Sequence, residues 1–176
     1  SNLYIDIGST NIKWQADGGG TESVSFPLPC RDQFPFYEVE TVRILEIIQN
    51  LILQKKAKRV FFSVQMHGYV LAEKSGQELT NYISWKDCRA AFVNIPFTVD
   101  KKSGSAMKNN LPRAGVYASK VLGLIPKSGA LEFFTLGSYL MYKLTGKNIT
   151  HITDAAASGY YNAATCLPLL DDSILL

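Results

Sequence analysis

A group of polar residues near the start of the chain has the chemistry that phosphate binding requires. Asp6 falls at the end of an apolar run, where a carboxylate is costly unless it is exposed or paired with a cation. Gly8 follows, and a glycine lets the backbone approach a ligand closely. Successive N–H groups in such a turn form an anion-binding concavity, and the hydroxyls of Ser9 and Thr10 add further donors. The spacing therefore predicts a turn that binds phosphate.

Lys13 is the next cation along the chain. By strand alternation it shares a face with Asn11 and Gln15, so it can lean back over the turn. A carboxylate that binds Mg²⁺ through water, a turn for phosphate oxygens and a nearby cation are what phosphoryl transfer requires. These residues predict phosphate and metal handling at Asp6 and Lys13. A plain hairpin in which Asp6 only closes the turn explains the same residues and stays open.

A second group of polar and aromatic residues lies in the middle of the chain and suits a sugar. Gln65 and His67 come off the end of a predicted buried strand, and both side chains can donate to and accept from hydroxyls. Trp85 offers a flat apolar face for the C–H surface of a sugar. The candidate substrate-binding residues are Gln65, Met66, His67, Trp85 and Asp87.

Other ionisable residues near this group have simpler explanations. Asp87 and Arg89 could bind hydroxyls, but two residues apart at a helix start they could equally pair locally or cap, and we favour a mainly structural role. With only two histidines in the chain, no metal site or catalytic triad is indicated. We expect His151 to be a surface residue and Asp154 to have a capping or structural role.

The surrounding pattern predicts an α/β layer fold with a mixed sheet. Short links between the first three strands favour an antiparallel three-strand meander, flanked by helices. This order is similar to the ribonuclease H-like half-domain shared by actin-like ATPases and many sugar kinases. The expected strands are 3–7, 11–15, 23–26, 58–64, 69–72 and 82–84, and the expected helices are 38–54, 87–92, 113–124 and 129–144, the last ending at a glycine cap.

The two motifs together resemble a known family. The hairpin is similar to the first phosphate motif of the actin-like ATPase superfamily. The Gln-Met-His-Gly turn at 65–68 and the Ser-Trp-Lys-Asp-Cys-Arg segment at 84–89 resemble the FGGY carbohydrate kinases, most of all the xylulokinase-type branch. The likeness runs from the hairpin through 144–146 to 153–159, which is nearly the whole chain.

The resemblance implies particular roles. Asp6 would position Mg²⁺ through water, Lys13 would offset developing charge, and the 8–10 turn would hold the phosphate oxygens of ATP. His67 would contact the sugar and would not act as a general base. The form of the 65–68 turn favours a ketopentose such as xylulose, although kinases for gluconate and heptuloses share much of it.

The resemblance also implies that something is missing from the chain. FGGY kinases have two domains, and the catalytic aspartate base and most of the adenine-binding surface lie in the second. We therefore expect residues 1–176 to be a single N-terminal sugar-binding domain without the C-terminal ATP-binding domain, and inactive alone. Two alternatives stay open: another actin-like ATPase of the dehydratase-activator type, and a non-catalytic sugar-binding module.

Composition excludes several other classes. The 176 residues are 47% hydrophobic with a formal charge of +3, and no Lys/Arg run is long enough to follow a nucleic acid backbone. No apolar stretch has the length of a membrane span. The isolated cysteines Cys30, Cys88 and Cys166 fit neither disulfides nor zinc, which favours a reducing cytoplasm. The expected partner is a small-molecule sugar, with a homodimer of the full-length enzyme as a further expectation.

Overall fold

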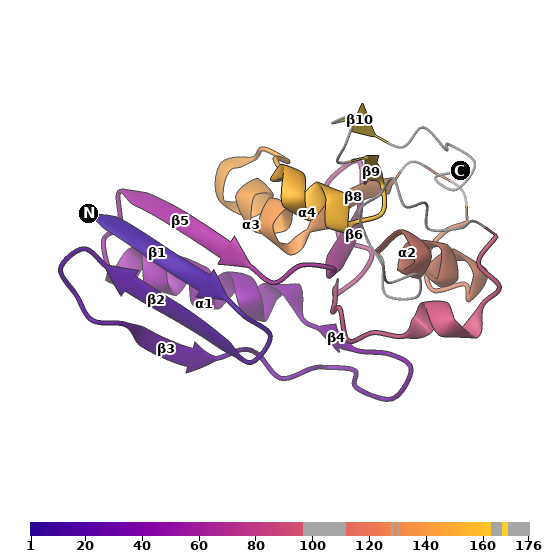
Figure 1. The fold of residues 1–176 in the computed structure, drawn as a ribbon, viewed down its shortest axis with the longest axis horizontal. Helices are drawn as coiled ribbons and strands as arrows, with labels where there is room; N and C mark the ends of the chain where they lie inside the picture. Colours follow the sequence, from indigo (N-terminus) through magenta and orange to yellow (C-terminus); the bar gives the residue numbers. More distant parts are fainter. Residues whose placement is uncertain (97–111, 128, 130, 163–166, 169–176) are drawn as a thin grey trace.

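The computed structural model describes residues 1–96, 112–127, 129, 131–162 and 167–168 (Figure 1). No helix within these ranges is long and apolar enough to span a bilayer. The strands are β1 (Asn2–Ile7), β2 (Asn11–Ala16), β3 (Glu22–Ser25), β4 (Glu38–Val39), β5 (Arg59–Val64), β6 (Tyr69–Glu73), β7 (Tyr82–Ile83), β8 (Leu131–Thr135), β9 (Tyr161–Asn162) and β10 (Leu167–Pro168). The helices are α1 (Thr41–Gln54), the 3₁₀ helix η1 (Arg89–Phe92), α2 (Pro112–Val121), α3 (Leu136–Thr145) and α4 (Ile152–Ala157).

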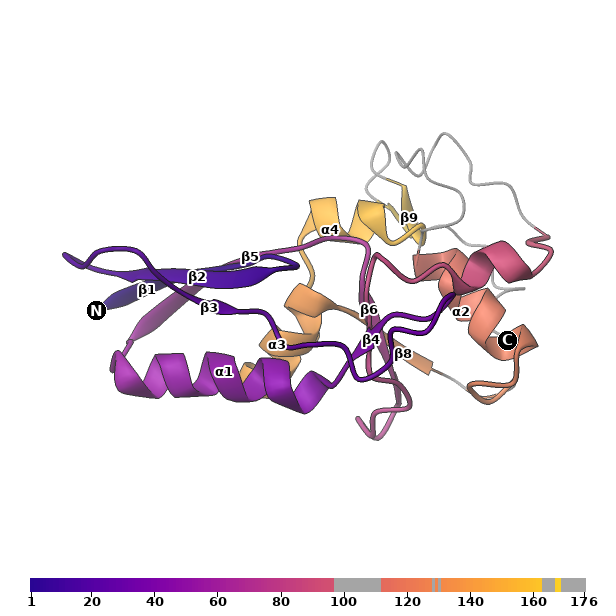
Figure 2. The same cartoon turned by 90° about the horizontal axis from the view of Figure 1, so that it is seen from below.

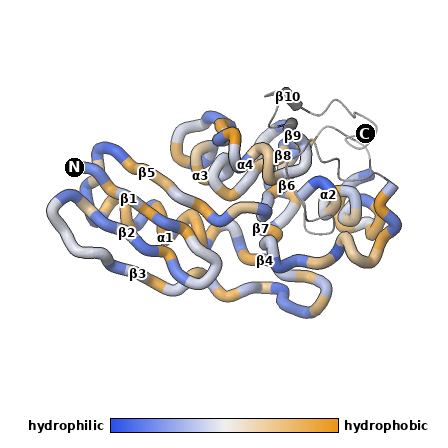
Figure 3. Tube along the Cα trace, in the orientation of Figure 1, coloured by the Kyte–Doolittle hydropathy of each residue, from blue (hydrophilic) through white to orange (hydrophobic). Residues whose placement is uncertain are grey.

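The first sheet has the strand order β3-β2-β1-β5. The first three strands form the predicted antiparallel meander, and β5 pairs with β1 in parallel, so the mixed sheet is confirmed. Exposed and more buried positions alternate along β1, β2 and β5, and Figure 3 shows hydrophilic and hydrophobic residues along β1 and β2. The apolar face, which includes Leu3, Ile5 and Ile7, is buried against α1, which lies along that side of the sheet (Figure 2).

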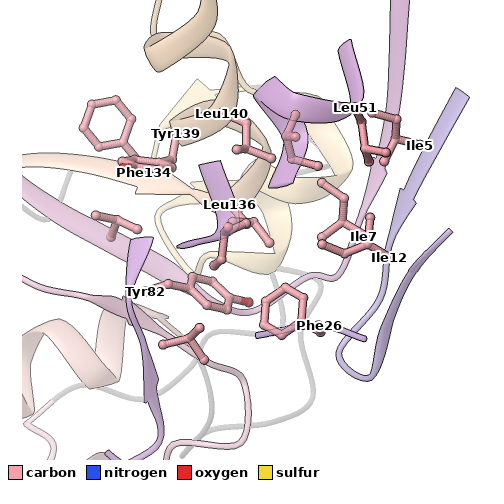
Figure 4. Close-up of a cluster of buried hydrophobic side chains, with 14 of the residues drawn as sticks. Ile5, Ile7, Ile12, Phe26, Leu51, Tyr82, Phe134, Leu136, Tyr139 and Leu140 are labelled. Atoms are coloured by element: carbon pink, nitrogen blue, oxygen red, sulfur yellow. The ribbon is translucent and has the colours of Figure 1, made fainter. Parts of the chain in front are cut away.

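One core joins this sheet to the rest of the molecule. Ile7 and Ile12 from the sheet and Leu51 from α1 lie in the same cluster as Leu136 of α3 and Tyr82 of β7 (Figure 4). The site therefore rests on a continuous packed body.

The second sheet has the order β4-β7-β6-β8 and is antiparallel throughout. The predicted strand pair around residues 74–76 is present as β6 and β7, with Gly76 at φ +87° in the turn. The predicted helix over 129–144 was wrong in its first half, because 131–135 forms strand β8. Pairing with five residues of β6 satisfies its backbone, and Thr135 then caps α3 by accepting from the Ser138 N–H at 3.2 Å.

The predicted start of α1 was also wrong. Glu38 and Val39 were expected in the first helical turn, but they pair with β7 as strand β4, and α1 begins at Thr41. Glu38 lies in β4, before the helix, and its carboxylate binds the buried guanidinium of Arg89 at 2.7 Å. The segment predicted as a helix over 87–92 is the short 3₁₀ helix η1. Cys30 and Cys88 are free thiols, and Cys166 lies outside the described residues.

Candidate functional site

The two sequence motifs meet at the ends of neighbouring parallel strands. In the β1–β5 pair Ile7 lies opposite Val64, and the Gln65 N–H then donates to the Ile7 carbonyl at 2.9 Å. The Gln65 side chain continues the contact, because its Nε2 donates to the Gly8 carbonyl at 3.3 Å. The predicted phosphate turn and the predicted sugar turn are therefore in direct contact, although 57 residues separate Gly8 from Gln65.

Asp6 lies on the exposed face of the first sheet, between two polar neighbours. Its register partners are Lys13 on β2 and Ser63 on β5, so all three side chains leave the same face. All three are exposed and line a hollow of about 410 Å³. Ser63 was not predicted as a site residue, although the alternation of strand 58–64 and its parallel pairing with β1 put it there.

The surroundings of Asp6 can be tested against Mg²⁺. No cluster of three or more metal-ligating side chains occurs among the described residues, so Asp6 would act as a single carboxylate ligand. Mg²⁺ dehydrates reluctantly and is usually held by one or two carboxylates, waters and substrate phosphates. The exposed Asp6, with open space beside it, fits that mode of binding.

The hairpin turn differs from the prediction in one respect. The N–H of Gly8 donates to the Asn11 carbonyl at 3.0 Å and closes the turn, so this N–H is not available to a phosphate. A side chain on Gly8 would bring its Cβ to 3.1 Å from the same carbonyl oxygen, which explains the glycine. In the described residues no hydrogen bond uses the N–H or hydroxyl of Ser9 or Thr10. The donors that this turn leaves open to a ligand are therefore those of Ser9 and Thr10, and their binding of phosphate stays a prediction.

His67 occupies an unusual backbone conformation in the second turn. Its φ is +67°, a left-handed value that few residues other than glycine adopt, and its Nδ1 lies 3.2 Å from the carbonyl oxygen of Ala157 at the end of α4. Gly68 follows directly against Tyr82, whose hydroxyl oxygen lies only 2.0 Å from where a Cβ would be. The turn is therefore fixed by two contacts, with Tyr82 of β7 and with Ala157 of α4.

Trp85 leaves the second sheet at the same end as His67. Tyr69 lies opposite Ile83 in the β6–β7 pair, and His67 and Trp85 each lie two residues outside that pair. Trp85 is 38% exposed, so part of its ring is open to a ligand. The antiparallel pairing thus sends two predicted sugar contacts, 18 positions apart in the sequence, off the same end of the sheet.

Asp87 and Arg89, shortly after Trp85 in the chain, form a buried ion pair. Arg89 is 2% exposed, and its Nε and Nη2 donate to the Asp87 carboxylate at 2.8 Å each. Asp87 also accepts from the Tyr37 N–H at 2.8 Å. Burial alone would lower the pKa of Arg89, but its bonds to Asp87 and Glu38 raise this pKa above its usual range. With both Asp87 oxygens bonded to the protein, the geometry favours the structural role over contact with substrate.

Asp154 is a second buried acidic residue, as little exposed as Asp87. It is 7% exposed and lies in α4, where it lines a groove of about 680 Å³ together with Met66 of the predicted sugar turn. Burial raises the pKa of the Asp154 carboxyl, although the Thr135 hydroxyl and the two histidines act in the opposite direction. His151, as predicted, is exposed, and it caps α4.

Comparisons with known proteins can be set beside this geometry. Residues 37–166 match the model of the FGGY family of carbohydrate kinases, N-terminal domain. A xylulose kinase of Staphylococcus epidermidis is 35% identical over 100 residues, which is 49% of this chain and 20% of that protein.

Two solved structures share the fold of the chain. A ligand-bound xylulose kinase from Lactobacillus acidophilus has a TM-score of 0.83 at 24% identity and covers 99% of this chain. A gluconate kinase from the same organism has a TM-score of 0.80, also at 24% identity and 99% coverage. The chain spans only 40% and 39% of these two proteins. The fold likeness includes the opening hairpin, which lies outside the family match.

Proposed function

Because the match covers most of its length, the chain belongs to the FGGY family of carbohydrate kinases, and we propose that it serves a kinase that phosphorylates a sugar hydroxyl from ATP. The observation that carries this proposal is the contact between Gln65 and Gly8. It brings a turn suited to phosphate against a turn suited to hydroxyls, which is the arrangement that phosphoryl transfer to a sugar needs. The family match also favours this function over a dehydratase-activating ATPase.

In this proposal the first turn and its neighbours bind phosphate and metal, and the second turn binds the sugar. ATP supplies the phosphoryl group, and Mg²⁺ offsets the charge on its oxygens. Asp6 would hold the metal through water, Ser9 and Thr10 would donate to phosphate oxygens, and Lys13 would offset negative charge from the opposite strand.

The sugar is held by the second turn in this proposal. Gln65 and His67 would bind its hydroxyls, and Trp85 would cover an apolar face of the ring or chain. Met66 lines the neighbouring 680 Å³ groove, and in this proposal it would limit the size of the ligand on that side.

The general base for the transfer would come from outside this chain. The chain spans about two fifths of each structural relative, so a second domain can supply the base and the adenine site. We therefore propose that the chain alone does not turn over, and that closure of two domains excludes water from the reaction. A reducing cytoplasm and a homodimer of the complete enzyme remain predictions.

Among sugars, a ketopentose such as xylulose is the proposed substrate, in line with the xylulose kinase relative. The decisive experiment is a phosphorylation screen of the complete protein against ketoses, aldonates and polyols. Turnover with a ketopentose is expected. Absence of turnover with every compound, despite bound ATP, would overturn the kinase proposal and leave a non-catalytic sugar-binding module.

The two turns can be separated by mutation in the complete protein. Asp6→Ala should lower kcat by at least about 10²-fold, the scale of losing one preorganised electrostatic group, with little change in sugar affinity. His67→Ala should mainly raise KM for the sugar. Equal loss of kcat and sugar affinity in both variants would contradict this division of roles.

A further inference from the structure

The hydrogen bond between His67 and Ala157 defines which ring nitrogen carries the hydrogen. Nδ1 lies 3.2 Å from the Ala157 carbonyl oxygen. A carbonyl can only accept, so this bond requires hydrogen on Nδ1, and a neutral ring then has its lone pair on Nε2. In the described part of the chain no hydrogen bond uses His67 Nε2. The nitrogen available to a ligand is therefore an acceptor.

The second histidine provides an internal reference. His151 accepts the N–H of Thr153 at its Nδ1, at 3.3 Å. Its Nδ1 also lies 2.8 Å from the Thr153 hydroxyl oxygen, which can donate to it as well, so the cap geometry favours the lone pair on Nδ1 and, in a neutral His151, hydrogen on Nε2. These contacts favour opposite tautomers for the two histidines of the chain.

The orientation of His67 is set by structure on three sides. The backbone of His67 is held at φ +67°, and Gly68 is packed so closely on Tyr82 that a larger residue would force a shift. Ala157 belongs to α4, and Asp154, one turn earlier in α4, is buried beside the N-terminus of α3. A Cβ on Gly137 of α3 would lie 3.4 Å from Asp154 Oδ2, so the two helices are in close contact here.

Gln65 repeats the pattern that His67 shows. Its amide nitrogen donates to the Gly8 carbonyl, and its Oε1 is buried without a hydrogen-bond partner among the described residues. An unpaired buried acceptor is unfavourable, and a hydroxyl that reaches it relieves that cost. Both polar side chains of the turn therefore use their donor on a backbone carbonyl and retain their acceptor.

We propose that this turn acts as a pair of hydrogen-bond acceptors that selects a hydroxyl-bearing end of the sugar and disfavours a carboxylate there. A hydroxyl can donate to His67 Nε2, whereas a carboxylate has no hydrogen to donate and its lone pairs are repelled. The inference rests on the proposed kinase function and deepens it, because it separates ketoses and polyols from aldonates.

The tautomer of His67 can be measured directly, without an assay of enzymatic activity. In long-range ¹H–¹⁵N spectra of the complete protein labelled at histidine, at a pH where both rings are neutral, His67 should carry hydrogen on Nδ1 and His151 on Nε2. His67→Asn and His151→Gln assign the signals. Hydrogen on Nε2 of His67 overturns the proposal, whatever the enzyme phosphorylates.

The specificity is measured with two sugars of similar size, a ketopentose and an aldonate. His67→Gln offers an amide that is free to present either its oxygen or its NH₂, so the ketose-to-aldonate ratio of kcat/KM should fall by about two- to tenfold. His67→Asn reproduces the Nδ1 side of the ring and not Nε2, so KM for the ketose should rise by a similar factor. His151→Gln is the matched control and should leave the ratio unchanged.

Two results would overturn the selection by His67. One is a wild-type protein that prefers the aldonate, and the other is an unchanged ratio in His67→Gln. Failure of the kinase proposal is distinguishable from both, because calorimetric binding of ketose and aldonate reports the same discrimination when no sugar is phosphorylated.

Discussion

The two turns of the candidate site are held in different ways. The hairpin turn at 8–10 depends on strand pairing next to it, and its chemical side chains Asp6 and Lys13 are exposed. The turn at 65–68 is fixed by distant parts of the chain, through Ala157 and Tyr82. The segment after Trp85 is anchored by the Asp87–Arg89 ion pair, in which the arginine is only 2% exposed.

This difference suggests how the two turns perform their functions. A polyphosphate is recognised largely by charge, and exposed donors on a hairpin suffice for it. A neutral sugar offers only hydroxyls and C–H surface, so its selection depends on side chains that packing has already oriented. Substitutions in the hairpin should therefore change chemistry with little effect on stability, and substitutions around the second turn should change both.

The largest expected effect follows from removing Arg89. Arg89→Met leaves the buried carboxylate of Asp87 without its cation, which typically costs about 3–5 kcal/mol, whereas Glu38 keeps Arg31 as a partner at 3.4 Å. Urea unfolding followed by circular dichroism measures this loss. Lys13→Met is the matched control in the hairpin, where we expect a change within about 0.5 kcal/mol because the side chain is exposed.

A second variant protects this prediction against simple failure to fold. Adding Asp87→Asn to Arg89→Met removes the stranded charge of Asp87 and should recover part of the lost stability. No recovery, or a loss in Lys13→Met equal to that in Arg89→Met, would remove the distinction between the two regions.

An intermediate effect is expected from a single methyl group. Gly68→Ala would place Cβ 2.0 Å from the Tyr82 hydroxyl oxygen and should cost about 1–3 kcal/mol, the usual range for overpacking. Gly20→Ala, in the β2–β3 turn, meets nothing within 4 Å and is the matched control, with an expected change within about 0.5 kcal/mol. Thermal melting of the two variants decides the point, and equal melting temperatures would contradict the packing argument.

The same contrast explains how much the sequence could predict. The hairpin is local, so alternation and turn residues placed β1, β2 and Lys13 correctly. The parallel return of β5, and with it the mixed sheet, also followed from strand and helix order. What local pattern could not predict is that Gly8 uses its own N–H to close the turn.

Errors arose where long-range pairing overrode local periodicity. Residues 131–135 have apolar spacing that also fits a helix, but β6 offers them a complete set of backbone partners. Glu38 has the charge typical of a first helical turn, but its ion pair with the buried Arg89 is a long-range contact that the local sequence does not indicate. The tie between His67 and Ala157 spans 90 residues, and no local signal indicates it.

The smallest expected effect comes from Asp154, which belongs to the second region through α4. Burial raises the pKa of its carboxyl in the folded protein, so its favourable contribution is complete below the unfolded pKa, about 3.9, and is lost as the pH rises through the folded pKa. Asp154→Asn keeps the shape and removes this loss. The stability of the variant relative to wild type should therefore increase from about pH 3 to about pH 7, by about 1 kcal/mol or less. Urea unfolding across this range measures the change. A relative stability that stays constant or falls with pH would show that the Thr135 hydroxyl and the histidines outweigh burial, and that α4 holds His67 through an ionised Asp154.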